Sequence, residues 1–352
     1  MLNTDQIRAL PKVALHEHLD GALRPQTVID HCREAGHVLP SYDAEELRTW
    51  FFTAADSGDL VTYLTTFDHT TAAMQTREHL RRVAREFVLD LAADGVIYAE
   101  TRWAPEQHTR NGLSEAEAVE AVRDGLAEGM AQVAGEGGSI LVQQLLTSMR
   151  HAEPTTRIAE LVIAYRDQGV CGFDIAGAED GFPPTRFQEA FDYLRANNAY
   201  FTIHAGEAFG PASIWQAVQL CGAHRIGHGV RIVEDIADGR LGRLASYVRN
   251  QRIALEVCPT SNLQTGIAAT LAEHPVDLLR RLGFRLTISC DNRLVSNTTL
   301  TNEFARLSEV FGWGLPEIGW CTANAMKAAF LDYEEKRRLL DTVIRPAYLA
   351  AG

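Results

Sequence analysis

Two histidines stand two residues apart at the end of a hydrophobic segment, in the stretch V-A-L-H-E-H-L-D-G that begins at Val13. Side chains at positions i and i+2 of a strand point to the same face, so His16 and His18 would face the same way on a strand. Neutral imidazole is a good ligand for a divalent metal such as zinc. An H-x-H pair alone is a weak signal, because surface and core histidines are common.

Further ligand-type and acid–base side chains follow other candidate strands. The stretch Y-F-T-I-H-A-G-E ends with His204 and Glu207, R-I-G-H-G contains His228, and T-I-S-C-D-N ends with Asp291 and Asn292. Each of these residues, taken singly, could be an ordinary buried polar residue. Their shared position after a strand favours one joint site over separate chance placements.

Eight short, β-rich apolar segments alternate with amphipathic helical stretches such as residues 77–93, 114–134 and 154–168. This alternation predicts an α/β fold with a parallel sheet. We expect a TIM (β/α)8 barrel and not an open doubly wound sheet. In a barrel the first and eighth strands are neighbours, so that their carboxyl ends converge on one site. The predicted strands are residues 13–19, 95–103, 139–147, 170–177, 200–206, 224–229, 253–259 and 284–291.

The segment between the first two strands is too long for a plain connection. Residues 20–93, which include Tyr63 and Phe67, are expected to form a helical insertion. Two interpretations stay open: helices over the barrel mouth that act partly as a lid, or a peripheral excursion. The chain beyond Thr301 is expected to form C-terminal helices that pack on the barrel. We expect residues 1–352 to form a single catalytic domain.

The composition narrows the class of protein. The chain has 352 residues, 46% of them hydrophobic, and a formal net charge of −13. Proteins that bind phosphate backbones need a basic face, so no nucleic-acid partner is expected. The six cysteines are scattered without a C-x-x-C motif, which suits reduced thiols in a cytoplasmic protein. No apolar run reaches transmembrane length and none near the N-terminus suits a signal peptide, so no membrane association is expected.

Six motifs together resemble a known family. H-E-H-L-D-G, D-I-A-G, H-A-G-E, R-I-G-H-G, E-V-C-P-T-S-N and I-S-C-D-N, in this order and at these intervals, resemble the adenosine deaminase family of the metal-dependent amidohydrolase superfamily. The resemblance extends from about Leu10 to about Phe330. It implies a zinc-containing TIM barrel that deaminates adenosine, and also 2′-deoxyadenosine, to inosine and ammonia in purine salvage. The expected partner is thus a small purine nucleoside.

The resemblance implies a metal site with one ion. Carried over to this chain, the zinc ligands would be His16, His18, His204 and Asp291, which leaves a coordination position for water, as a catalytic zinc requires. Other members of the superfamily use two metals bridged by a modified lysine on strand four. Residues 171–177, C-G-F-D-I-A-G, contain no lysine, so we expect one zinc per chain.

The resemblance also implies roles toward the substrate. Glu207 would protonate purine N1, which requires a carboxyl group whose pKa burial has raised. His228 would lie beside the metal-bound water, as a base or as an orienting group. Gly177 would offer its backbone N–H to purine N3, and a side chain there would block the approach. Asp20 would accept a hydrogen bond from the ribose 5′-hydroxyl, and His18 would also contact the substrate.

Asn292 departs from the family pattern, in which many members carry a second acid. An amide donates without a titrating proton, so Asn292 could still bind purine N7. Glu100 and Arg102 are expected to form an intrabarrel ion pair, with a substrate contact as the alternative. The segment 258–262 either touches the substrate or forms a tight turn. No role is assigned to the remaining histidines of the helical and loop patterns, His31, His37, His69, His79, His108, His151 and His274.

Other functions compete with this one. The nearest is a deaminase of free adenine or of a modified adenine nucleoside. Relatives that act on the free base usually carry Glu where this chain has Asp20, which favours a nucleoside. A cytidine-type zinc deaminase would need H-x-E combined with P-C-x-x-C, and this combination does not occur. A catalytically silent barrel that acts as a binding protein is the alternative from another class. The sequence does not indicate the oligomeric state.

Overall fold

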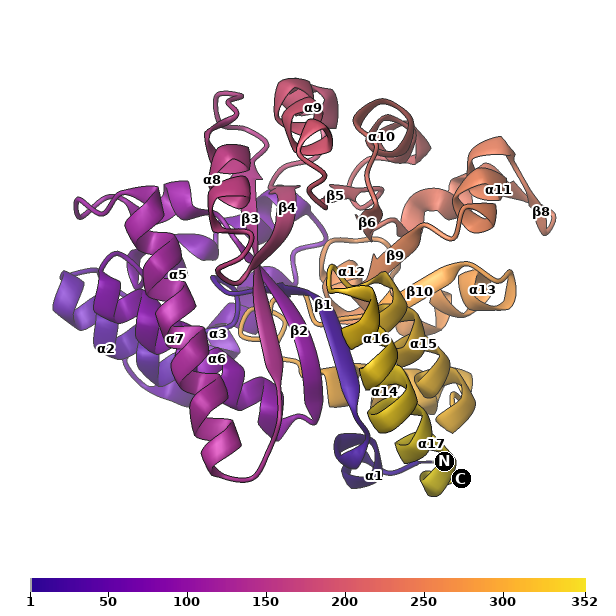
Figure 1. Cartoon of the computed structure of the whole chain (residues 1–352), viewed down its shortest axis with the longest axis horizontal. Coiled ribbons are helices and arrows are strands. Elements are labelled where there is room, and N and C mark those ends of the chain that lie inside the picture. Colours follow the sequence, from indigo (N-terminus) through magenta and orange to yellow (C-terminus); the bar gives the residue numbers. More distant parts are fainter. Residues whose placement is uncertain (1) are drawn as a thin grey trace.

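The computed structural model describes residues 2–352 and contains two parallel four-stranded sheets at its centre, in the orders β1-β2-β3-β4 and β10-β9-β6-β5. A bridge between Phe173 and Phe201 joins the sheets beside β4 and β5, and a bridge between Glu17 and Asp291 joins them beside β1 and β10. The sheets therefore close into one eight-stranded barrel, and the predicted TIM barrel is confirmed (Figure 1). The barrel strands are β1 (Lys12–His18), β2 (Val96–Trp103), β3 (Leu141–Met149), β4 (Val170–Ala176), β5 (Thr202–Ala205), β6 (Arg225–His228), β9 (Ala254–Val257) and β10 (Arg285–Ile288).

Side chains of β1 point alternately to the outer helices and to the interior of the barrel. All seven of its residues are buried, as expected for a barrel strand covered by helices on its outer face. Val13 and Leu15 pack outward with Met326 of the C-terminal helices. His16 and His18 lie on the opposite face, at the carboxyl end of the strand, and so reach the interior of the barrel.

The long helices of the barrel agree with the predicted periodic segments. Helix α6 (Arg77–Ala93) packs against α7 (Glu115–Gly135), and Ser114 caps α7 in a capping box with Glu117. Gly125 permits this close packing, because a Cβ atom there would lie 2.2 Å from the backbone oxygen of Arg81. Helix α8 (Arg157–Tyr165) occupies the core of the third predicted helical segment.

The insertion after β1 is helical, as predicted, and it divides into two parts. Helix α2 (Pro25–Ala35) lies at the left edge of Figure 1, and α3 (Ala44–Ala55) is labelled further in, near α6 and α7. No residue of either helix lines the central cavity. Helices α4 (Leu60–Leu64) and α5 (Phe67–Ala72) line the central cavity at the barrel mouth. The interpretation as a cover over the mouth therefore holds for α4 and α5, and the peripheral interpretation holds for α2 and α3.

The remaining helices complete the outer layer, and those beyond Thr301 form the predicted C-terminal group, drawn in yellow beside β1 in Figure 1. A small antiparallel hairpin of β7 (Ile236–Ala237) and β8 (Arg240–Leu241) lies outside the barrel and was not predicted. The other α-helices are α1 (Thr4–Ala9), α9 (Gln188–Ala196), α10 (Pro211–Trp215), α11 (Arg243–Asn250), α12 (Pro259–Gln264), α13 (Val276–Arg281), α14 (Leu300–Phe311), α15 (Leu315–Ala328), α16 (Tyr333–Leu339) and α17 (Arg345–Ala351). Short 3-10 turns are η1 (Pro105–His108), η2 (Pro184–Phe187), η4 (Val230–Asp235) and η5 (Leu271–Glu273), and π-helical turns are η3 (Gln216–Cys221) and η6 (Leu340–Ile344).

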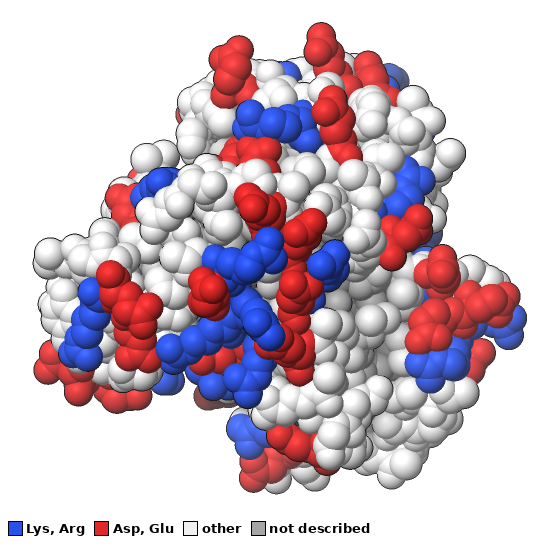
Figure 2. Space-filling view, turned by 60° about the vertical axis from the view of Figure 1, so that its left-hand side comes forward, with Lys and Arg blue, Asp and Glu red and all other residues white. Residues whose placement is uncertain are grey.

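Charged side chains of both signs lie side by side on the face shown in Figure 2. Ion pairs join α2 and its N-cap residue to α6, with Arg24 2.7 Å from Asp90 and Arg82 2.9 Å from Asp30. On this face, basic and acidic side chains are therefore interspersed. Among residues 2–352, no helix combines the length and the apolar character needed to span a membrane.

Candidate functional site

A cavity of about 320 Å³ opens at the carboxyl ends of the barrel strands. Its wall includes every predicted site residue except His16, which lies fully buried beneath it. Leu60 and Tyr63 from α4 and Phe67 from α5 form part of the wall and make it largely enclosed. The barrel thus brings residues from the first and last strands to one place.

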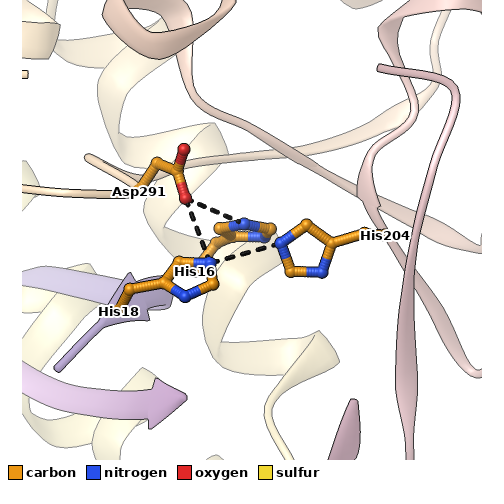
Figure 3. Close-up of side chains that lie close together, drawn as sticks. All are labelled: His16, His18, His204 and Asp291. Carbon is orange, nitrogen blue, oxygen red and sulfur yellow. Dashed lines mark hydrogen bonds and ion pairs between the residues drawn. The ribbon is translucent and has the colours of Figure 1, made fainter. Parts of the chain in front are cut away.

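Four of these residues form a compact cluster of metal-ligand atoms. The ligand atoms of His16, His18, His204 and Asp291 all lie within 4.8 Å of one another. Nε2 of His18 is 3.2 Å from Nε2 of His204 and 3.2 Å from Oδ1 of Asp291. The three rings and the carboxylate converge on a common point (Figure 3). The structure therefore brings together the four residues that the sequence predicted as ligands.

The chemistry of this donor set fits a divalent cation. Nε2 of His16 is buried and makes no hydrogen bond, although Oδ1 of Asp291 lies 3.4 Å from it. Burial of an unpaired polar atom is costly, and a metal ion at the common point would relieve that cost. Three imidazole nitrogens with one carboxylate oxygen are ligands that zinc accepts in catalytic sites. Asp291 adopts a left-handed backbone conformation, with φ 64°, which is uncommon for a residue with a side chain.

Buried carboxylates orient two of the ligand rings from behind. Nδ1 of His16 lies 2.8 Å from Glu256, and Nδ1 of His204 lies 3.0 Å from Asp174. Each carboxylate accepts the Nδ1 proton, so the Nε2 lone pair of each ring faces the cluster. Burial alone would raise the pKa of Asp174, but His204 and Arg102 lower it to about 2. Arg102 joins the two carboxylates, with hydrogen bonds of 2.8 Å to each.

The predicted ion pair between Glu100 and Arg102 is wrong. Glu100 pairs with Arg225 of β6, whereas Arg102 pairs with Asp174 of β4 and Glu256 of β9. Arg225 also binds Glu256, so the charges form one buried network across the barrel. Glu100 and Arg102 do share one face of β2, but charged residues on β4, β6 and β9 lie closer to each of them. Neither residue lines the cavity, which also excludes the alternative of a direct substrate contact.

Glu207 follows β5 and lies in the cavity wall with only 5% of its surface exposed. Burial, followed by the charges of Asp291 and Glu179, raises the pKa of Glu207 well above its usual range. The carboxyl group can therefore keep its proton near neutral pH and donate it. Oε2 of Glu207 is 3.5 Å from Nε2 of His228, which ends β6. The two predicted acid–base residues are thus neighbours.

None of residues 258–262 lines the cavity, and the segment is not a tight turn, because Pro259 begins the short helix α12. Proline is favoured in the first turn of a helix, where its missing N–H is not needed. Ser261 of this helix donates to Oδ2 of Asp291 at 2.7 Å, and Asn262 lies 3.1 Å from Nδ1 of His228. The helix therefore supports a ligand residue and a cavity residue from behind.

The remaining predicted residues also lie at the cavity. Gly177 has φ 101°, a conformation that residues with a side chain rarely adopt. Oδ1 of Asp20 is buried without a hydrogen-bond partner, which leaves an acceptor available. The side-chain nitrogen of Asn292 donates to the hydroxyl of Tyr63 at 2.8 Å. Asn292 also packs on Gly21, where a Cβ atom would lie 1.9 Å from its Oδ1.

Several residues near the cavity were not predicted. Their partners come from distant parts of the chain, and a position shortly after a strand could have indicated only His151 and Glu179. His151, to which the sequence assigned no role, lines the cavity beside Gly177. His274 contacts Asn262 at 3.2 Å. Tyr63, Asp174, Glu179 and Glu256 also support or line the site without an assigned role in the sequence analysis. Arg102, Ser261 and Asn262, for which the sequence suggested other contacts, support the site from behind.

An eight-stranded α/β barrel with this ligand cluster at the carboxyl ends of its strands defines the class of metal-dependent amidohydrolases. Residues 11–346 match the family model described as adenosine deaminase. The protein named adenosine deaminase 1 from Streptomyces coelicolor is 57% identical over 350 residues, which cover 98% of this chain and 88% of that protein. This chain therefore belongs to the adenosine deaminase family, and it shares with that family the character of a hydrolase and a metalloenzyme.

Two solved structures are similar over most of the chain. An adenine deaminase from Arthrobacter aurescens is 25% identical with a TM-score of 0.81, covering 95% of this chain and 98% of that one. An amidohydrolase from Burkholderia ambifaria, solved with bound Zn, is 23% identical with a TM-score of 0.85, covering 99% of this chain and 93% of that one. The second likeness, at this identity, concerns the fold alone.

Proposed function

We propose that this protein is a zinc enzyme that hydrolytically deaminates adenosine, and also 2′-deoxyadenosine, to inosine and ammonia. One observation carries the proposal: a buried carboxyl group with a raised pKa, Glu207, shares a cavity with the His16, His18, His204 and Asp291 cluster. A binding protein has no use for a proton donor beside a metal site. The family and the 57% identity to a protein named adenosine deaminase 1 support the same activity.

Zinc is the proposed ion, with His16, His18, His204 and Asp291 as its ligands and one ion per chain. When bound, zinc supplies a Lewis acid that lowers the pKa of coordinated water to about 7. Glu256 and Asp174 hold two of the rings with their Nε2 atoms toward the ion position. The donor set and the family support zinc over a harder ion such as magnesium, which prefers oxygen ligands.

Glu207 is the proposed proton donor. When the oxygen of water adds to C6 of adenine, the ring loses its aromaticity and negative charge develops at N1. A proton delivered to N1 by Glu207 neutralises that charge, so that the carboxyl group must be protonated when the substrate binds. Its burial and the nearby charges of Asp291 and Glu179 favour the protonated form. His228, 3.5 Å from Glu207, faces the same part of the cavity.

Four residues are the proposed contacts to the purine nucleoside. The backbone N–H of Gly177 would bind N3, and the unpartnered oxygen of Asp20 would accept the ribose 5′-hydroxyl. His18 lines the cavity and would contact the substrate as well. The Asn292 amide has a second N–H besides the one given to Tyr63, and this N–H would bind N7.

Free adenine is the second candidate substrate, because a structural neighbour is an adenine deaminase. The short carboxylate of Asp20 in the cavity wall favours a nucleoside, since the free base has no hydroxyl to offer. We further propose a single catalytic domain over residues 1–352, supported by one hydrophobic cluster from Ile7 to Cys321. We also propose a cytoplasmic place in purine salvage, which the six free cysteines support.

The test is a substrate panel with the purified protein. Adenosine, deoxyadenosine, adenine and N6-methyladenosine are followed by loss of adenine absorbance and by ammonia release, with elemental analysis alongside. We expect adenosine to be the best substrate and about one zinc per chain. Faster turnover of adenine would replace the nucleoside proposal. Two tightly held metals per chain, or turnover that survives their removal, would contradict the mononuclear zinc site.

A further inference from the structure

A chain of hydrogen bonds connects the backbone of α13 to the ring of His228. The backbone N–H of Val276 donates to Nδ1 of His274 at 3.1 Å. Nε2 of His274 lies 3.2 Å from Oδ1 of Asn262, and Nδ2 of Asn262 lies 3.1 Å from Nδ1 of His228. The three side chains are buried, with exposed fractions of 3%, 0% and 1% for His274, Asn262 and His228. Because they are buried, each group must donate to or accept from its neighbour in this chain of hydrogen bonds.

The backbone amide at the start fixes the direction of every bond. An N–H group can only donate, so Nδ1 of His274 carries a lone pair and Nε2 carries the ring proton of the neutral imidazole. Burial lowers the pKa of His274 to about 3, which keeps the ring neutral. Its Nε2–H requires an acceptor, which is the oxygen of the Asn262 amide. The amide nitrogen then faces His228 and can only donate to it.

These bond directions determine which ring nitrogen of His228 carries the proton. Because Nδ1 accepts from Asn262, the neutral ring of His228 carries its proton on Nε2. Nε2 is the nitrogen on the Glu207 side, 3.5 Å from Oε2 of that residue. His228 also adopts a left-handed backbone conformation, with φ 59°, so the packing around it holds the ring in one place.

We propose that Asn262 and His274 are positioning residues that hold His228 as its Nε2–H tautomer, so that His228 is a hydrogen-bond donor in the cavity and not a proton acceptor. The sequence left both roles open for His228. This inference rests on the proposed function, since it assigns to His228 the orientation of the oxygen that adds to C6. A tautomer with its proton on Nδ1 would present a lone pair instead and could act as a base.

The direct test is the nitrogen spectrum of His228. Protein with ¹⁵N-labelled histidine is measured with and without metal, and the His228 signals are assigned by their absence from His228→Gln. We expect a protonated Nε2 and an unprotonated Nδ1 in the native sequence. In Asn262→Asp, a carboxylate accepts from both rings, so the proton of His228 should move to Nδ1. A native His228 with its proton on Nδ1, or the same tautomer in both proteins, would overturn the proposal.

Kinetics test whether the tautomer matters. Asn262→Asp should lower kcat at least about 100-fold, the scale of a lost catalytic hydrogen bond or acid–base group, while zinc content stays the same. Asn250→Asp makes the same change at an exposed position in α11 and should leave kcat unchanged. Native-like kcat in an Asn262→Asp protein whose tautomer has moved would refute the role.

His274→Phe is the second variant, in case Asn262→Asp fails to fold. It keeps the bulk of the ring but removes the donor that orients the Asn262 amide. We expect both tautomers of His228 and a kcat lowered at least about tenfold. A single Nε2–H tautomer with native kcat would count against the proposal. Should the native protein not deaminate adenosine, the proposed function fails, and the spectrum still reports the tautomer.

Discussion

Glu179 holds the backbone of Glu207. One carboxylate oxygen of Glu179 accepts the N–H of Glu207 at 3.0 Å and those of Ala208 and Phe209 at 2.8 and 2.9 Å. The other oxygen accepts the N–H of Gly206 at 2.7 Å. Four consecutive amides around one anion form a nest, the arrangement by which backbones commonly bind anions. Here the anion belongs to the loop after β4 and the amides to the loop after β5.

Replacing Glu179 with Gln should therefore impair the proton donor without removing any group from the cavity. The amide nitrogen of Gln would face N–H groups that need an acceptor, and hydrogen bonds to charged groups are worth about 1.5–3 kcal/mol each. We expect kcat to fall at least about tenfold. The neighbouring exposed residue provides the control, because Asp180→Asn removes the same charge. Equal steady-state rates for the two variants would show that the nest does not position Glu207.

Glu207→Gln should retain zinc and fold but lose at least about 100-fold in kcat, the usual scale for a general acid. Amide and acid have nearly the same shape, so the cavity should keep its volume. The measurement is single-turnover conversion of adenosine beside metal content. Native-like turnover would remove Glu207 from the mechanism.

The pH dependence follows from the direction of the Glu207 pKa shift. Below the raised pKa the carboxyl group holds the proton that N1 needs, so kcat/KM should fall as pH rises through it. Glu207→Gln should lack this fall. In the folded protein Glu207 keeps a proton that it would lose above about pH 4.3 in the unfolded chain. The free energy of unfolding should therefore decrease as pH rises from about 4.3 to the raised pKa of Glu207. Between about pH 5 and 8, the Tm of Glu207→Gln should therefore rise relative to the Tm of the native protein as pH increases. If the two Tm values change in parallel with pH, Glu207 is not buried in its protonated form.

Asn292→Ala should cost about 1–3 kcal/mol in kcat/KM for adenosine, because a donor to N7 is lost. A 7-deaza substrate lacks that acceptor and should lose less. Tyr63→Phe is the matched control, since it removes only the hydroxyl that Asn292 contacts at 2.8 Å. If both substrates suffer equally in Asn292→Ala, the residue serves only to hold Tyr63 and the strand end.

Asp20→Ala should weaken adenosine turnover by about 1.5–3 kcal/mol in kcat/KM, as expected for one charged hydrogen bond. The buried Oδ1 of Asp20 accepts no hydrogen bond, with Nδ1 of His18 3.7 Å away, so the 5′-hydroxyl is its expected donor. Turnover of 5′-deoxyadenosine should change little. Equal losses for both nucleosides would show that Asp20 does not bind the 5′-hydroxyl.

The clustering of the proposed ligand residues could be predicted because strand ends are visible in the sequence. His16, His204 and Asp291 each follow a short apolar run, and closure of the barrel alone brings such positions together. The network behind them could not be predicted, because its pairs depend on which strand faces which across the barrel. Glu100 and Arg102 look like partners on β2, yet β4, β6 and β9 supply the residues they bind.

Loops were predicted less well than strands for a related reason. Glu179 stands in an irregular segment without period or motif, and only the neighbouring loop explains its burial. Pro259 and Asn262 suit a turn or a first helical turn equally, and contacts with Asp291 and His228 select the helix. The insertion after β1 showed helical patterns, but which helices reach the cavity depends on packing.

The bridge that Arg102 makes between Asp174 and Glu256 limits how this scaffold could be re-engineered. Each carboxylate holds the ring of one histidine of the cluster, so one guanidinium links the orientation of two proposed metal ligands that are 188 positions apart in the chain, His16 and His204. Removing one member of such a buried network costs about 3–5 kcal/mol, since it leaves an unpaired charge. A designer could exchange the loops to alter specificity, but metal affinity and thermal tolerance would change together with any alteration of Arg102.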